Sequence, residues 1–250
     1  PIISQFGSYL KNASQGDFGE SLRYRGRSVS GLIGPKLIVS AKLSFVSLLI
    51  SILIGLPLGF LIAHKQGTWI DPFIVTISVT FMSIPIMITI PALLWIGCLK
   101  TDLVPCSGWG GLFDKRIIIP ALTMGIPGIA FMIRIMRAST LDVLGQDYIR
   151  TAKAKGLNFF TISNRHVLRN SMIPIITILS FALAGILGGA FITETILGIP
   201  GIGRFSVESI FNRDYPVIMA ITLIGAVAFI LANLVADISY SIIDPRIRYK

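Results

Sequence analysis

Long apolar runs alternate with shorter polar stretches along this chain. Five runs carry no charged side chain, and they cover residues 43–63, 73–99, 117–133, 171–193 and 216–236. About 20 helical residues are needed to cross a hydrocarbon core of about 30 Å. The pattern therefore predicts an all-α fold, a polytopic transmembrane helical bundle with five spans.

Composition supports a membrane protein and excludes several functions. Hydrophobic residues make up 53% of the chain and charged residues only 14%. The formal net charge of +10 comes from loops and tails, without a soluble basic domain, so we expect no nucleic-acid partner. The chain has no Gly-Lys dipeptide, and so no phosphate-binding loop of the Walker type, and no H-E-x-x-H motif. No Ser/His pair lies at membrane depth, and we expect no enzymatic activity and no catalytic residue.

The most polar internal segment, residues 137–170, is called the basic loop here. It holds six Lys or Arg residues and two Asp residues, a balance of +4, and such loops stay on the cytoplasmic side. Two spans later, Arg246, Arg248 and Lys250 share that side, which predicts a cytoplasmic C-terminus. Five spans then put residues 1–40 outside as an extracytoplasmic lead-in to the membrane domain at 41–250. Since those 40 residues are basic and the chain begins at Pro1, we expect a sixth, N-terminal span in the intact protein.

The basic loop has the pattern of two short helices. Tyr148 to Lys155 are good helix formers, Gly156 suits a left-handed helix end, and Asn158 suits the cap of a second helix. The apolar side chains that follow, from Phe159 to Val167, have two interpretations. They insert into a groove on a soluble protein, or they pack back on the inner ends of the spans.

Small and polar residues carry further expectations. The pairs Gly55/Gly59 and Gly185/Gly189 have the spacing of closely packed helices, the interpretation that we favour. Prolines within the apolar runs either kink helices along a pathway or are simply tolerated by neighbouring groups. Cys98 and Cys106 match no metal site. They are ordinary cysteines in the favoured interpretation, with a disulfide in an oxidising compartment as the alternative. His64 and His166 are expected to be solvated residues at the inner edges of spans.

Five collinear segments resemble one protein family. They are Arg137-Ala138-Ser139-Thr140-Leu141-Asp142-Val143-Leu144, Arg165-His166-Val167-Leu168-Arg169-Asn170, Pro200-Gly201-Ile202-Gly203-Arg204, Arg213-Asp214-Tyr215-Pro216 and Asp244-Pro245-Arg246-Ile247-Arg248. All resemble the B-type permease subunits of dipeptide, oligopeptide and nickel ABC importers, over residues 17–250. The run from Arg150 through Gly156 to Pro174 also resembles the EAA loop of binding-protein-dependent permeases, although Arg150-Thr151 replaces the usual Glu-Ala.

The resemblance implies a six-helix permease of the type I ABC importer kind, working by alternating access. Its partners would be a homologous C-type permease, two cytoplasmic ATPase subunits, an extracytoplasmic solute-binding protein and membrane lipid. No cofactor is expected in this chain, because the ATPase subunits would bind ATP. The localisation implied is the bacterial inner membrane. The substrate would be a di- or oligopeptide, with nickel or another metal chelate and glutathione as alternatives; an ion-coupled secondary transporter is the alternative from another class.

Two sets of site residues follow from the resemblance. The ATPase-coupling set is Tyr148, Arg150, Thr151, Ala152, Lys155, Gly156, Leu157, Phe159 and Phe160. The second set lies in residues 194–215, called the outer loop here, whose charges are expected to face water at the outer gate and to contact the binding protein. Its members are Glu194, Arg204, Glu208, Arg213 and Asp214.

Overall fold

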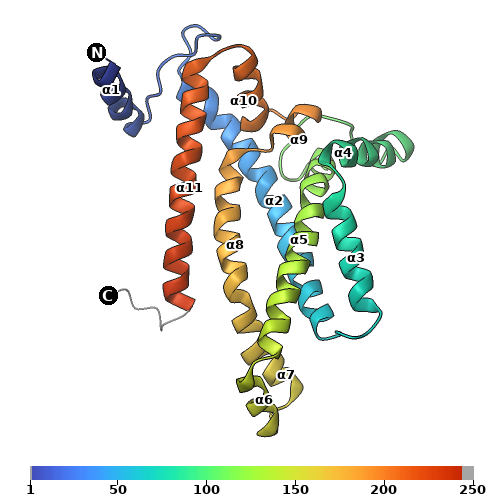
Figure 1. Cartoon of the computed structure of the whole chain (residues 1–250). Coiled ribbons are helices and arrows are strands. Elements are labelled where there is room, and N and C mark those ends of the chain that lie inside the picture. The colour runs from blue at the N-terminus through green and yellow to red at the C-terminus, as the bar shows by residue number, and fades with distance from the viewer. Residues whose placement is uncertain (1, 244–250) are drawn as a thin grey trace. The chain divides into compact units, whose positions relative to one another are not determined.

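The computed structural model describes residues 2–243, and regular structure in that range is helical (Figure 1). An isolated bridge between Glu20 and Ser28 is the β-type pairing found there. The helices are α1 (Ile2–Ser14), α2 (Val29–Ala63), α3 (Ile70–Ser83), α4 (Ile86–Leu94), η1 (Trp95–Lys100), η2 (Lys115–Ile117), α5 (Ile118–Leu144), α6 (Asp147–Ala154), α7 (Phe159–Thr161), η3 (Ile162–Leu168), α8 (Arg169–Gly188), α9 (Phe191–Ile196), α10 (Ile202–Phe211) and α11 (Tyr215–Ile243). The all-α prediction is confirmed. The C-terminal residues Asp244 to Lys250, including the predicted cytoplasmic cations, lie outside the described range.

Four helical stretches are long and apolar enough to span a membrane, and a bent pair brings the number to five if it counts as one span. The four are Val29–Ala63, Lys115–Leu144, Phe159–Leu183 and Tyr215–Val235. They correspond to four of the five apolar runs. The helices extend beyond those runs in several places: α2 begins at Val29 rather than near residue 43, and α5 continues past Arg134 to Leu144.

The remaining run, residues 73–99, is not one straight helix. Ile70–Ser83 and Ile86–Lys100 meet at an angle of 97°. The break falls at Pro85, which has no N–H to donate, and the preceding Ile84 has the extended backbone that a following proline favours (φ −77°, ψ 118°). Because α3 has only 14 residues, about 21 Å of helix, it is shorter than a hydrocarbon core. The run therefore counts as the fifth predicted span only if the bent pair crosses the membrane as one unit.

The described chain groups into two compact units. Within the described residues, one comprises 2–45, 90–121 and 184–231, and the other comprises 46–89, 122–183 and 232–243. The core of the first unit joins the start of α2 to α10 and α11. Its fully buried members are Val29, Ile33, Ile202, Phe205, Val217 and Ala220.

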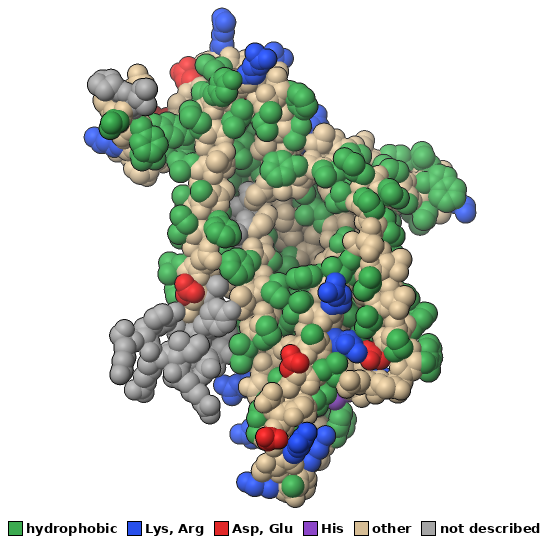
Figure 2. Space-filling model, viewed as in Figure 1, with side chains coloured by type: hydrophobic (Ala, Val, Ile, Leu, Met, Phe, Trp, Pro, Cys, Tyr) green, Lys and Arg blue, Asp and Glu red, His purple; other side chains and the backbone are tan. Residues whose placement is uncertain are grey.

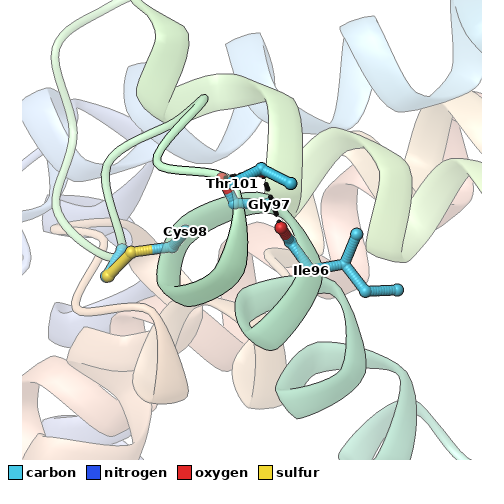
Figure 3. Close-up of a disulfide and its surroundings, with 5 residues drawn as sticks. Ile96, Gly97, Cys98 and Thr101 are labelled. Atoms are coloured by element: carbon cyan, nitrogen blue, oxygen red, sulfur yellow. Dashed lines mark hydrogen bonds between the residues drawn. A yellow bond between two sulfur atoms is a disulfide. The ribbon is translucent and has the colours of Figure 1, made fainter.

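A disulfide between Cys98 and Cys106 closes the loop that follows η1 in the first unit (Figure 3). Their Cα atoms lie 5.3 Å apart, and Thr101 between them folds back to donate to the Ile96 carbonyl at 2.7 Å. The amide of Gly108 then donates to the Leu197 carbonyl at 2.9 Å. The favoured interpretation of two ordinary cysteines is thus wrong, and the alternative of a disulfide is the one realised.

Helices α2 and α5 approach each other closely in the second unit. A Cβ atom on Gly59 would lie 2.6 Å from the Ile133 carbonyl oxygen, and one on Gly55 would lie 2.6 Å from Cβ of Met132. The predicted close packing is confirmed for this pair. The second pair is different. An added Cβ on Gly185 would meet no described atom within 4 Å, whereas Gly189 (φ +75°) lies beyond the end of α8, where its added Cβ would be 2.6 Å from the Gly203 amide nitrogen of α10.

Candidate functional site

The basic loop has the two-helix form that its sequence predicts. Helix α6 ends at Ala154, and Gly156 has φ +77°, the left-handed conformation that glycine adopts without strain. The Asn158 side chain then accepts a 2.8 Å hydrogen bond from the Thr161 amide and caps α7. From Phe159 the helix continues through η3 into α8, so the second half of the basic loop is the beginning of a membrane-spanning stretch.

The basic loop has a small core of its own. Ile149 and Ala152 of α6 pack with Ile162 and Val167 of η3, and Phe60 of α2 packs against this cluster. Two of the apolar residues with alternative interpretations therefore pack inward. Ala152 is only 7% exposed, so the expectation that its side chain faces a partner is wrong. A small side chain is needed there because the helices of the loop meet at that point.

The rest of the predicted coupling set lies on the surface of the basic loop. Phe159 and Phe160 are 62% and 75% exposed, although aromatic side chains usually gain from burial. Figure 2 shows Lys and Arg side chains gathered around the end formed by α6 and α7. The exposed members of the set are Tyr148, Arg150, Thr151, Lys155, Gly156, Leu157, Phe159 and Phe160.

Glu194 does not face water, contrary to the prediction. Its carboxylate is fully buried and accepts hydrogen bonds from the Ser40 hydroxyl (2.6 Å), the Ala190 amide (3.0 Å) and the Arg204 amide (3.0 Å). The same hydroxyl of Ser40 accepts from the Ile202 amide at 2.8 Å. Buried carboxylates need such partners, and this one organises the turn between α9 and α10.

Asp214 is also buried rather than solvated. It accepts from the hydroxyl of Ser21, from the Leu22 amide at 3.1 Å and from the Arg23 amide at 3.4 Å. It thereby fastens the turn at residues 20–28 to the junction of α10 and α11. Its neighbour in the chain, Arg213, is exposed as predicted.

Arg204 and Glu208, the two other members of the outer set, form a half-exposed ion pair with each other at 2.7 Å. An exposed pair of this kind contributes little to stability. Because both side chains are half-exposed, their charges are accessible to a partner. The outer loop thus brings three predicted residues to the surface, Arg204, Glu208 and Arg213, while the two remaining acids hold its fold.

Sequence reasoning missed two polar contacts in the second unit. Arg137 of α5 makes two hydrogen bonds to Asp71 at the start of α3, at 2.5 and 2.7 Å. His64, expected to be simply solvated, is half-buried and contacts Ser163 of η3. Residue types and spacing gave no signal for either contact, because the partners are far apart in the chain. Among the described residues no cluster of three or more His, Cys, Asp or Glu side chains could hold a metal ion.

Comparison with known proteins agrees with these features. The chain is 37% identical over 249 residues to the oligopeptide transport system permease protein OppB of Haemophilus influenzae, covering 100% of this chain and 81% of that protein. It is 37% identical over 248 residues to the dipeptide transport system permease protein DppB of Bacillus subtilis, covering 99% and 80%.

Solved structures show the same fold. An inward-facing structure of the MetNI methionine ABC transporter matches 85% of this chain and 96% of its own, with a TM-score of 0.67 and 18% identity. Residues 55–249 match the family described as binding-protein-dependent transport system inner membrane component. With a family match over most of its length, relatives at this level of identity and several membrane-spanning helices, the chain belongs to the binding-protein-dependent transport system inner membrane components, as a multi-pass permease.

Proposed function

We propose that this chain is the B-type permease subunit of an ATP-driven peptide importer, and that its basic loop binds the cytoplasmic ATPase subunits. The observation that carries the second part is the surface of that loop. Four large side chains are exposed on a loop that has its own buried core: Tyr148, Leu157, Phe159 and Phe160. Exposed aromatic side chains and Arg are enriched at protein interfaces.

A peptide substrate is supported by the names of the relatives, which are oligopeptide and dipeptide permeases. The charge-free runs offer small polar side chains such as Ser83, Thr89 and Ser180, which suits a solute selected by a separate binding protein. The second permease subunit would be a homologous C-type chain. Nickel chelates and glutathione are the substrates to test as competitors.

The proposed orientation has two independent supports. Disulfides persist in oxidising compartments, which favours the outside for the Cys98–Cys106 loop. Helix α5 begins soon after that loop and has 27 residues, about 40 Å, enough to cross the membrane. The basic loop at the other end of α5 would then be cytoplasmic, as its positive charge also favours. Two further crossings put the C-terminus on the cytoplasmic side.

The test is reconstitution. The chain is co-expressed with the second permease and both ATPase subunits, and the complex is placed in vesicles with the external binding protein. We expect uptake of radiolabelled di- and tripeptides that depends on ATP and on the binding protein. Competition by unlabelled peptide, but not by nickel or glutathione, would identify the substrate class. A complex that hydrolyses ATP without importing any peptide would contradict the proposal.

A further inference from the structure

We propose that His64 is a positioning residue for energy coupling, which ties the inner end of α2 to the basic loop so that α2 follows the movement of that loop. The inference rests on the proposed function. Residues 55–64 and 143–168 all belong to the second compact unit, and their contacts carry the argument.

Both nitrogens of the His64 ring have a hydrogen-bond partner. Nδ1 lies 2.9 Å from the carbonyl oxygen of Phe60, one helical turn earlier. A carbonyl oxygen can only accept, so Nδ1 carries a hydrogen, and in the tautomer with its one hydrogen there Nε2 is an acceptor. Nε2 lies 3.1 Å from the hydroxyl oxygen of Ser163, which therefore donates to it. Both ring nitrogens are satisfied, one by α2 and one by the basic loop.

Aromatic contacts lead from the surface of the basic loop to the same ring. The ring centroids of Phe160 and Phe159 are 6.0 Å apart, those of Phe159 and His64 5.4 Å, and those of His64 and Phe60 4.6 Å. The three contacts have edge-to-face geometry, which is favourable for aromatic pairs. The outer two members, Phe160 and Phe159, are the most exposed aromatic side chains of the proposed ATPase contact. A displacement of these rings is thus passed by direct contact to His64.

Apolar packing fixes the same end of α2. Phe60 lies against the core of the basic loop formed by Ile149, Ala152, Ile162 and Val167. One residue earlier, Gly59 allows α2 to touch the backbone of α5 at Ile133. The end of α2 is therefore held by a polar contact and an apolar contact that lie one helical turn apart.

Helix α2 needs non-covalent contacts to move with the basic loop, because the chain does not run directly from α2 into that loop. Helices α5 and α8 are covalently continuous with the loop, whereas His64 and Ser163 are separated by 99 residues. Ser163 is buried, so a hydroxyl that loses its acceptor there loses a hydrogen bond without gaining water. Loss of one such bond shifts an equilibrium between two arrangements by roughly fivefold.

The test compares four single variants in the reconstituted complex, with transport per ATP hydrolysed as the readout. His64→Phe keeps an aromatic ring between Phe60 and Phe159 but cannot accept from Ser163. Ser163→Ala removes the donor. His64→Gln restores an acceptor with similar reach. Asn164→Ala, on the exposed side of the same η3 segment, is the matched control.

We expect His64→Phe and Ser163→Ala each to lower transport per ATP by about threefold to tenfold. A double variant that combines these two substitutions should lower it no further. His64→Gln and Asn164→Ala should stay close to the wild-type ratio. A merely structural role would reduce ATP hydrolysis and uptake together and leave their ratio unchanged, which would overturn the inference. So would equal losses in His64→Phe and His64→Gln, or wild-type ratios in both His64→Phe and Ser163→Ala. Failure of the proposed function is distinguishable, since the wild-type complex would then import no peptide.

Discussion

The hydroxyl of Ser40, on α2, donates a 2.6 Å hydrogen bond to Oε1 of Glu194, and both residues are buried. The contact joins positions 154 residues apart and satisfies one side of a carboxylate that has no access to water. Two backbone amides satisfy the rest. The fold of the outer loop therefore depends on an acid that its sequence alone would place on the surface.

Replacement of Glu194 should destabilise the outer loop more than replacement of Ser40. Glu194→Ala leaves three donors without their acceptor, the buried Ser40 hydroxyl and two part-buried amides, and a buried donor left unpaired costs about 1–3 kcal/mol. Ser40→Ala removes only one donor and one acceptor. We expect the thermal midpoint of the purified complex to fall in the order Glu194→Ala, then Ser40→Ala, with Glu208→Ala near wild type because its ion pair is half-exposed. A Glu208→Ala midpoint as low as that of Glu194→Ala would contradict this assignment.

Loss of the Asp214 carboxylate should loosen the turn at residues 20–28. Asp214→Asn keeps the shape but weakens the hydrogen bonds from Ser21, Leu22 and Arg23. Since three exposed arginines lie in or beside this turn, trypsin should cleave it at least severalfold faster in the variant. The control is Asp17→Asn, in an exposed turn, where Asp17 accepts only from Gly19. Equal cleavage rates in both variants and the wild type would show that Asp214 does not hold the turn.

Gly59 should tolerate no side chain. The Cβ atom of Gly59→Ala would lie 2.6 Å from the Ile133 carbonyl oxygen, a backbone atom, so α2 and α5 must separate. We expect a loss of about 1–3 kcal/mol, read as a lower thermal midpoint of the complex. Gly185→Ala is the matched control, because nothing lies within 4 Å of its added Cβ and alanine favours a helix. A midpoint that is unchanged in Gly59→Ala would contradict the close approach.

Gly156 offers a test of the basic loop through its backbone alone. A Cβ atom there meets nothing within 4 Å, so the cost of Gly156→Val comes from φ +77° and amounts to roughly 1–2 kcal/mol. We expect this variant to insert normally yet retain less ATPase subunit on purification. Gly156→Asn should retain more, since asparagine tolerates the left-handed conformation. Identical retention in the two variants would remove the backbone explanation.

The disulfide simplifies a test of orientation. The chain has two cysteines and both are in the Cys98–Cys106 bond, so an introduced thiol has no competing background. A membrane-impermeant thiol reagent should leave Lys153→Cys unlabelled in intact cells and label it in inverted vesicles. Labelling in intact cells would place the basic loop outside and refute the proposed orientation.

Local signals in the sequence were sufficient for local structure. Gly156 and Asn158 act within a few residues of themselves, and both do in the structure what their chemistry predicts. Pro85 likewise marks a break, although the sequence left open whether it would bend a span or be tolerated. Four of the five apolar runs likewise correspond each to one helical stretch, and the fifth forms the bent pair.

The sequence alone could not predict which residues far apart in the chain make contact. Arg213 and Asp214 are charged neighbours, yet one is exposed and the other is buried. Ser21, Leu22 and Arg23 supply the donors to Asp214 from 191 or more residues away. Ala152 belongs to the coupling set through the family resemblance, but its helical position turns it towards Ile162. In each case the sequence singled out the residue, but the residue type alone did not predict whether its side chain is buried.

The two exposed phenylalanines of the basic loop also bear on how the subunit survives before assembly. With Phe159 and Phe160 at 62% and 75% exposure, an unassembled chain presents an aromatic patch beside the exposed cations of the basic loop. Chaperones and proteases recognise such patches, and the proposed ATPase contact would cover this one. The cellular amount of this permease is therefore expected to follow the supply of its ATPase subunits, with surplus chains degraded rather than stored in the membrane.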